Sequence, residues 1–201
     1  HEAGAGTFAA TRSLREELAA RGFTKVRAWT RGVDLARFRP EPREAWEGLP
    51  RPVFLYAGRV AVEKNIEAFA ELKLPGTKVI VGDGPQREEL KKRYPDVKFL
   101  GAKFNEDLAV CYASADVFVF PSLTDTFGLV VLEAMASGTP VAAYDATGPR
   151  DVIPGSGAGT ITPVEGDLAA GAVACLDLDR ETCRKYAEGY SWRACAEAFI
   201  E

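Results

Sequence analysis

Between Val53 and Tyr144 the sequence alternates short apolar runs with longer amphipathic ones. The apolar runs are about four to six residues long and rich in Val, Phe and Ile, whereas the longer runs repeat apolar residues at helical spacing. Strands that alternate with helices pair in parallel through right-handed crossovers. We therefore predict an α/β fold with a Rossmann-like, doubly wound parallel sheet. Strands are expected at 53–58, 78–82, 97–101, 117–122 and 140–144, and helices at 65–72, 85–94, 106–115 and 128–137.

The two ends of the chain depart from this alternation. Residues 11–21 have the periodicity of an amphipathic helix, and Gly22 follows as a helix-ending residue. The stretch 37–52 is rich in Pro and charge and is predicted to be a connector. Residues 148–167 are glycine-rich and are predicted to be irregular. Three further helices are expected at 167–178, 180–190 and 191–200.

Charge and hydropathy argue against two classes of protein. The chain has 25 basic and 29 acidic residues, a net charge of −4, and no long block of like charge. A protein held on nucleic acid by bulk charge needs a basic surface, so we expect no nucleic-acid partner. No stretch approaches the roughly 18 consecutive apolar residues of a membrane-spanning helix. The first residues also lack the regions of a signal peptide, and we expect a soluble, unexported, cytoplasmic chain.

Histidine and cysteine limit the chemistry that this chain can perform. The single histidine is His1, so no internal catalytic pair that depends on an imidazole can form. No group of His, Cys, Asp and Glu has metal-ligand spacing, and we expect no metal site. The four cysteines show no CxxC pairing and are expected to be buried, reduced thiols. They are Cys111, Cys175, Cys183 and Cys195.

The loop after the first expected strand combines a glycine with two basic residues. The strand ends at Gly58, Arg59 follows, and Lys64 stands at the start of the next helix. A glycine allows close backbone approach, and two cations beside a helix N-terminus form an anion site suited to a diphosphate. The alternative, equally supported by these residues alone, is that both basic side chains are solvated and pair with Glu63 or Glu67.

The loop after the second expected strand reads VGDGP and contains Gly82, Asp83 and Gly84. A proline follows at the start of the next helix, where its fixed backbone angle is tolerated. This composition is common in turns that lead from a strand into a helix. Taken alone, the loop is therefore better explained as a structural turn than as a ligand site.

The most specific pattern lies at 121–141. Asp125 precedes an expected helix and Glu133 stands on it, with seven residues between them. Backbone N–H groups at the turn into this helix can hold phosphate oxygens or an anionic transition state. Glu133 can accept hydrogen bonds from a ribose diol; the alternative is a surface carboxylate, but its helix is otherwise apolar and a buried charge needs a partner. The turn consists of Thr126, Phe127, Gly128, Leu129 and Val130.

Five sequence strings together resemble the C-terminal, donor-binding domain of a GT-B glycosyltransferase of the large retaining family four, the glycosyl transferases group 1. In order along the chain they are GR-x4-KN, VGDGP, FLG, ASADVFVFPS and TDTFGLVVLEAMASGTPV. The resemblance runs from about Arg31 to the C-terminus and implies the C-terminal half of a GT-B fold. It divides the chain into a remnant of an N-terminal domain with its connector at 1–50, a Rossmann-like nucleotide-sugar-binding domain at 51–190, and a helix at 191–201 that returns toward the N-terminal domain.

The resemblance also implies a role for each candidate site residue. Arg59 and Lys64 match residues that hold the donor diphosphate, and Asp125 matches an acid that faces the sugar hydroxyls, so these three form the catalytic set. Glu133 matches the acid that binds the ribose. The first acid is usually a glutamate in this family, and the shorter Asp125 leaves the sugar undetermined. The other donor-binding residues are Gly58, Gly82, Asp83, Gly84, Thr126, Phe127, Gly128, Leu129 and Val130, with Lys103 and Leu108 beside the base.

The function implied by the resemblance is transfer of a hexose from a GDP- or UDP-linked sugar to a lipid or glycan acceptor, with retention at the anomeric carbon and without a metal cofactor. In this family the acceptor site lies in an N-terminal domain. The chain is therefore expected to be a partial copy of a longer enzyme and to turn over little. Peripheral contact with the inner face of the cell membrane would involve the same N-terminal domain.

Two alternatives stay open beside the transferase. One is a nucleotide-sugar-binding module without catalysis, and the other is an isolated domain that is inactive without its N-terminal half. A Rossmann-like oxidoreductase is disfavoured, because no GxGxxG follows the first expected strand. The residues do not identify the base, the sugar, the acceptor or the oligomeric state.

Overall fold

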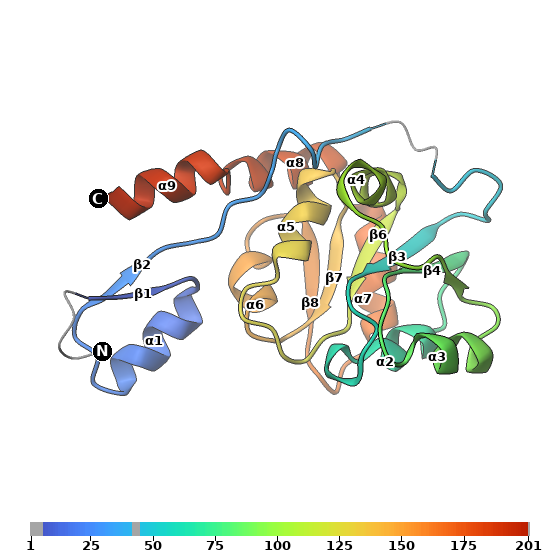
Figure 1. Cartoon of the computed structure of the whole chain (residues 1–201), viewed down its shortest axis with the longest axis horizontal. Coiled ribbons are helices and arrows are strands. Elements are labelled where there is room, and N and C mark those ends of the chain that lie inside the picture. The colour runs from blue at the N-terminus through green and yellow to red at the C-terminus, as the bar shows by residue number, and fades with distance from the viewer. Residues whose placement is uncertain (1–5, 42–44, 201) are drawn as a thin grey trace.

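A six-stranded parallel sheet forms the centre of the molecule, with strand order β5-β4-β3-β6-β7-β8 (Figure 1). The computed structural model describes residues 6–41 and 45–200, so His1 and part of the expected connector, 42–44, lie outside the described residues. The strands are β3 Val53–Ala57, β4 Thr77–Val81, β5 Lys98–Phe99, β6 Val117–Phe120, β7 Val141–Tyr144 and β8 Gly159–Thr162. The helices that follow them are α2 Ile66–Glu71, α3 Arg87–Arg93, α4 Asn105–Ser114, α5 Leu129–Ala136, α6 Pro149–Val152, α7 Leu168–Ala174, α8 Arg180–Glu188 and α9 Trp192–Ile200.

The expected alternation of strands and helices is confirmed, with one correction. The glycine-rich stretch 148–167 is not irregular, because it contains α6 and the edge strand β8. Strand β8 pairs in parallel with β7, and a Cβ on Gly159 would lie 2.2 Å from the carbonyl oxygen of Val141. A glycine is therefore required for the two backbones to approach, and the prediction of an irregular segment was wrong.

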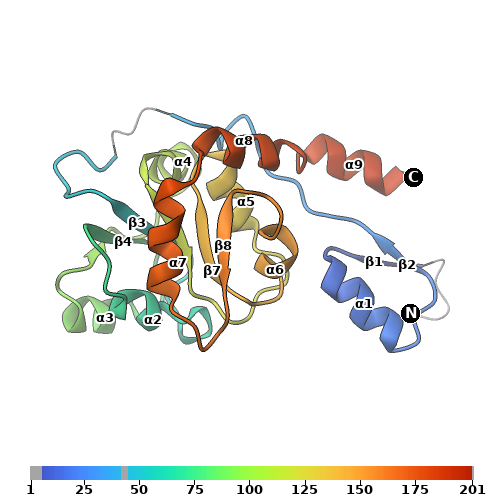
Figure 2. The same cartoon turned by 180° about the vertical axis from the view of Figure 1, so that it is seen from behind.

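Helices cover both faces of the sheet. Successive residues of a strand point to opposite faces, so each strand contributes side chains to two apolar cores. In β3, Val53, Leu55 and Ala57 pack into one apolar core, whereas Phe54 and Tyr56 pack into the other. The first core includes side chains of α4, α5 and α8, and the second includes side chains of α2, α3 and α7. Figures 1 and 2 show these two sets of helices on opposite faces of the sheet.

The strand order reverses direction between β3 and β6. From β3 the chain adds β4 and then β5 on one side, while β6, β7 and β8 lie on the other. The loops that follow β3 and β6 therefore diverge at the carboxyl edge of the sheet. Ligands of open α/β sheets bind in the crevice at such a point, so the loops after these two strands form the expected location of a site.

A small unit lies to one side of the six-stranded sheet (Figures 1 and 2). Helix α9 leaves the sheet domain and runs along this unit, where the indole N–H of Trp29 donates to the carbonyl oxygen of Cys195 at 3.1 Å. The ring of Phe199 lies 5.1 Å from the rings of both Phe8 and Trp29. The unit consists of β1 Thr7–Ala9, α1 Arg12–Ala20 and β2 Val26–Ala28, with β1 and β2 paired in parallel.

The four cysteines are in the state that the sequence predicts. All four cysteines are buried and free, as predicted. Over residues 6–41 and 45–200, no helix combines the length and apolarity that a membrane crossing requires. In the same part of the chain no group of three or more His, Cys, Asp or Glu side chains converges as a metal site would.

Candidate functional site

Two adjoining cavities open at the carboxyl edge of the sheet, and they share Ala57, Gly58 and Val130. One has a volume of about 420 Å³ and is named here the Lys64–Asp125 cavity. The other has a volume of about 270 Å³ and is named the Tyr112–Glu133 cavity. The Lys64–Asp125 cavity is also lined by Arg31, Tyr56, Phe120, Thr126, Phe127, Gly128, Leu129 and Trp192. The Tyr112–Glu133 cavity is also lined by Arg59, Val81, Gly82, Asp83, Ala102, Lys103, Phe104 and Leu108.

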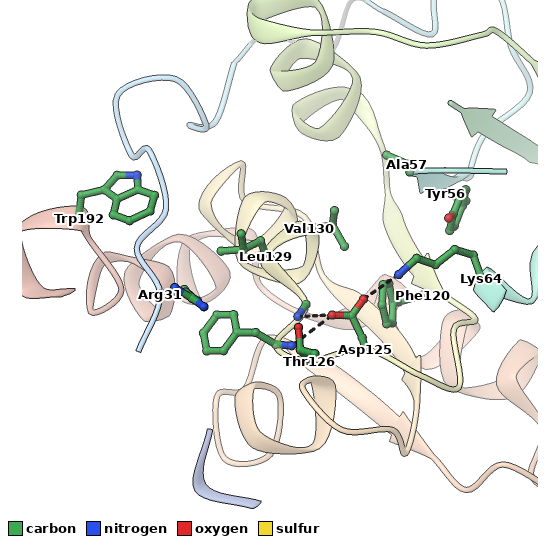
Figure 3. Close-up of a pocket in the computed structure, with 13 residues that line it drawn as sticks. Arg31, Tyr56, Ala57, Lys64, Phe120, Asp125, Thr126, Leu129, Val130 and Trp192 are labelled. Atoms are coloured by element: carbon green, nitrogen blue, oxygen red, sulfur yellow. Dashed lines mark hydrogen bonds and ion pairs between the residues drawn. The ribbon is translucent and has the colours of Figure 1, made fainter. Parts of the chain in front are cut away.

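An ion pair crosses the first cavity and joins the loops after β3 and β6 (Figure 3). The Nζ of Lys64 lies 3.0 Å from Oδ2 of Asp125, and both side chains are largely buried. The other oxygen, Oδ1, accepts hydrogen bonds from the backbone N–H groups of Phe127 at 3.2 Å and Gly128 at 2.9 Å. The carboxylate therefore holds the lysine on one side and the turn into α5 on the other.

These contacts decide the charge of Asp125. Burial by itself raises the pKa of this carboxyl, but the hydrogen bond from Lys64 and those from the two backbone amides outweigh it and lower the pKa below its usual value. Asp125 is therefore ionised at neutral pH. The local backbone makes the contact possible, because Gly128 has a φ of 78° and turns the chain sharply into α5.

The same contacts correct one expectation about the turn. Its amides were expected to face a ligand, but the N–H groups of Phe127 and Gly128 already donate to Asp125. A short aspartate just before a helix forms such local hydrogen bonds readily. Leu129 and Val130 open α5, and the first N–H groups of a helix have no intrahelical acceptor. The amides at these two positions are therefore directed toward the site and can bind an anion.

The glycines of the loops after β3 and β4 allow the two loops to touch. A Cβ on Gly82 would lie 1.8 Å from the carbonyl oxygen of Gly58, and a Cβ on Gly84 would lie 2.3 Å from that of Val60. The N–H of Val60 donates to the carbonyl oxygen of Asp83 at 2.9 Å. Gly58 and Gly82 line cavities, whereas Gly84 lines neither of the two. The contact between the loops supports the structural interpretation of the VGDGP turn.

The two basic residues of the first loop have different partners. Arg59 lines the Tyr112–Glu133 cavity, but its guanidinium is mostly exposed and lies 3.3 Å from the carboxylate of Glu63. The alternative of a solvated pair therefore describes Arg59 in this structure. It does not describe Lys64, because that lysine pairs with Asp125, while Glu67 is paired with Arg93. Lys64 ends a short 3₁₀ helix rather than beginning α2.

The second cavity contains a carboxylate of a different character. The hydroxyl of Tyr112, a fully buried residue of α4, donates to Oε2 of Glu133 on α5 at 3.1 Å. Burial raises the pKa of Glu133, and the hydrogen bond from Tyr112 and the charge of Arg37 only partly oppose the shift. Glu133 is thus not a surface carboxylate, and its partner is a neutral phenol rather than a cation.

Several residues of the site were not predicted from the sequence. Tyr56 shapes the first loop, because its hydroxyl donates to the carbonyl oxygen of Arg59 at 2.9 Å. Arg31 and Trp192 reach the Lys64–Asp125 cavity from segments outside the sheet. Tyr112 and Phe104 line the other cavity. The tyrosines occupy positions that read as core in the sequence, and no local signal distinguishes them from ordinary apolar residues.

Comparison with known proteins gives a consistent family. A family model described as "Glycosyl transferases group 1" matches residues 51–178. A GDP-mannose-dependent alpha-mannosyltransferase of Mycobacterium tuberculosis (strain CDC 1551 / Oshkosh) is 38% identical over 208 residues, covering 96% of this chain and 55% of that protein. The sulfoquinovosyl transferase SQD2 of Arabidopsis thaliana is 36% identical, over 96% of this chain and 43% of that protein.

A solved structure matches over nearly the whole chain. The sucrose-phosphate synthase of Thermosynechococcus elongatus superposes with a TM-score of 0.81 at 28% identity, covering 96% of this chain and 56% of that one. The predicted Rossmann-like α/β fold is thereby confirmed. The chain spans about half the length of the curated relatives that it matches.

Proposed function

The chain belongs to the glycosyl transferases group 1 family and has the fold of the C-terminal half of a GT-B enzyme, and from this premise we propose that it is the donor-binding part of a glycosyltransferase. The enzyme transfers a hexose from a GDP- or UDP-linked sugar to a lipid or glycan acceptor. One relative is named as GDP-mannose-dependent and another as a sulfoquinovosyl transferase, which supports a nucleotide-sugar donor without fixing the base.

The observation that carries the proposal is the pair of adjoining cavities with unlike carboxylates. A nucleotide sugar has an anionic diphosphate between a sugar and a nucleoside. The Lys64–Asp125 cavity contains a cation and an ionised acid, and it suits the diphosphate and the sugar. The Tyr112–Glu133 cavity has an apolar lining with a carboxylate acceptor, and it suits the ribose and the base. The cavities meet at Gly58, where a backbone without a side chain leaves room for the phosphates.

Charge stabilisation of the leaving diphosphate is the main catalytic contribution that we assign to this chain. Lys64, Arg59 and the opening amides of α5 at Leu129 and Val130 would meet the negative charge that develops when the bond to the sugar breaks. To contact the diphosphate, Arg59 would break its ion pair with Glu63. That step costs little free energy, because the pair is exposed to solvent. We propose on this basis that the transfer needs no divalent cation. From the family to which the chain belongs, we also propose that the transfer retains the anomeric configuration.

Asp125 is proposed to orient the sugar. A carboxylate has about four lone-pair positions, and three are used by Lys64 and by the amides of Phe127 and Gly128. The remaining position, on Oδ2, can accept a hydrogen bond from one sugar hydroxyl. Lys64 lies against the same oxygen, so the sugar and the diphosphate would be held by one connected pair of side chains.

The acceptor is assigned to a part of the enzyme beyond the sheet domain. We propose that residues 1–50 are the end of an N-terminal domain with the connector, that 51–190 form the donor-binding domain, and that 191–201 return toward the N-terminal domain. Contacts of α9 with Phe8 and Trp29 support this division. A nucleotide-sugar-binding module without catalysis is the second candidate, because the chain spans about half of its relatives.

Isothermal titration of the 201-residue chain with UDP, GDP and ADP, each with and without magnesium, tests the proposal. We expect saturable binding of a nucleoside diphosphate that does not depend on magnesium. Lys64→Ala should weaken it by roughly tenfold to a hundredfold, the usual effect of losing a hydrogen bond to a charged group. Lys92→Ala, which removes an exposed lysine of α3 that lines neither cavity, is the matched control and should bind normally. Equal affinity of the Lys64→Ala and Lys92→Ala variants would contradict the assignment.

A further inference from the structure

The Tyr112–Glu133 cavity is bordered by an aromatic side chain that is largely exposed to solvent. Phe104 lines this cavity, yet 71% of its surface is exposed to solvent. Within residues 6–41 and 45–200 its ring makes no stacking contact with another aromatic ring. An exposed large apolar side chain beside a cavity is a feature of binding sites.

Phe104 stands at the start of helix α4, a position that phenylalanine seldom occupies. Phe104 is the N-cap residue of α4, where its side chain makes no capping hydrogen bond. The N-cap position favours Ser, Thr, Asp and Asn, since their oxygens accept from the first amides of the helix. Helices α1, α7 and α8 follow this rule, because Thr11, Asp167 and Asp179 accept such bonds. A phenylalanine side chain has no oxygen that could accept such a hydrogen bond.

The residue after Phe104 has a backbone conformation that also destabilises the start of α4. Asn105 has a φ of 50°, in the left-handed region that non-glycine residues seldom adopt. Both positions therefore depart from what would best stabilise the start of α4. Departures of this kind are expected where a residue serves binding rather than folding.

We propose that Phe104 is the residue against which the base of the nucleotide donor stacks, and that this stacking favours a purine over a pyrimidine. The inference rests on the proposed function, which places the nucleoside in the Tyr112–Glu133 cavity. Every base has a π face that can lie on an aromatic ring, and a purine offers the larger one. Leu108 lines the same cavity and adds apolar surface, while Glu133 supplies the acceptor for the ribose.

The test compares Phe104→Ala with Phe104→Ser in titrations with GDP, UDP and inorganic pyrophosphate. Both variants should lose about tenfold to a hundredfold in affinity for GDP, the usual effect of removing a stacking ring. The loss for UDP should be smaller, and pyrophosphate should bind as it does to the unaltered chain. Phe104→Ser should also raise the melting temperature, because serine caps the helix. Phe104→Tyr should keep the affinity for GDP.

Matched measurements separate the possible outcomes. Phe199→Ala removes an exposed ring that lines neither cavity and should leave all three affinities unchanged. Unchanged GDP binding in Phe104→Ala would overturn the stacking role while leaving the proposed function intact. A loss that is equal for GDP and pyrophosphate, or larger for UDP than for GDP, would also overturn it. Failure of the unaltered chain to bind any nucleotide would instead overturn the proposed function, and the stacking role with it.

Discussion

The two cavities contain carboxylates that are close together in the sequence, but their pKa values are shifted in opposite directions. Asp125 is bound by a lysine and two backbone amides, which lower its pKa although burial opposes them. Glu133 is partly buried beside a tyrosine hydroxyl, and the burial raises its pKa. One helix and the turn before it therefore supply both a charged subsite and a hydroxyl-binding subsite. The partners provided by other elements, rather than the acids themselves, set the two characters.

Neutralising the two acids should change the free energy of unfolding in opposite directions, and the larger change is expected at Asp125. In Asp125→Asn the free energy of unfolding at pH 7 should fall by about 1–2 kcal/mol, because the charged hydrogen bonds to Lys64 and the amides weaken. The folded pKa of Asp125 is lowered, so the stabilisation is complete above the unfolded pKa and disappears as the pH falls through the folded pKa. Urea unfolding at pH 7 and at successively lower pH measures both effects.

Glu133→Gln should change stability in the other direction and by less than about 1 kcal/mol. The folded pKa of Glu133 is raised, so the folded state binds more protons than the unfolded state between the two pKa values. Stability contributed by this group therefore falls as the pH rises through that window. The variant should be slightly more stable than the parent at pH 7 and equal to it below the unfolded pKa. Destabilisation by both substitutions at pH 7 would remove the contrast between the cavities.

Tyr112→Phe should have the smallest effect and should act through Glu133. The hydroxyl lowers the pKa of Glu133 against the effect of burial, so its removal should raise that pKa further. Nucleotide affinity measured against pH should keep its shape and shift toward higher pH, with a loss of roughly two- to fivefold near neutrality. In a Glu133→Gln background the same substitution should produce no shift. A shift that persists there would show that Tyr112 acts independently of Glu133.

Much of the fold was predictable because the apolar runs of the strands are continuous and the helices are amphipathic. Strand β8 was missed because its short Thr-Ile-Thr run follows several glycines, and only the close approach to Val141 reveals why Gly159 is there. The pairing of β1 with β2 was missed for a similar reason. Each strand has three residues, too few for a periodic signal.

The site was predictable where the sequence spacing carries the information and not where tertiary contacts do. The spacing of Asp125 and Glu133 and the basic loop residue Lys64 indicated three residues that line the two cavities, but not the cavities themselves. The pairing of Lys64 with Asp125 joins residues 61 positions apart, so no local pattern could indicate it. Tyr112 reads as a core position of a helix, and its hydroxyl becomes informative only once Glu133 is found beside it.

The two cavities are proposed to bind the two halves of one donor, and separate titration of the halves tests this division. Pyrophosphate and the free nucleoside of the preferred base would each be titrated into the parent chain, Lys64→Ala and Glu133→Gln. We expect a crossed result: Lys64→Ala should lose pyrophosphate binding and keep nucleoside binding, while Glu133→Gln should lose nucleoside binding and keep pyrophosphate binding. Loss of both ligands in each variant, or of neither, would contradict the division of the site into two halves.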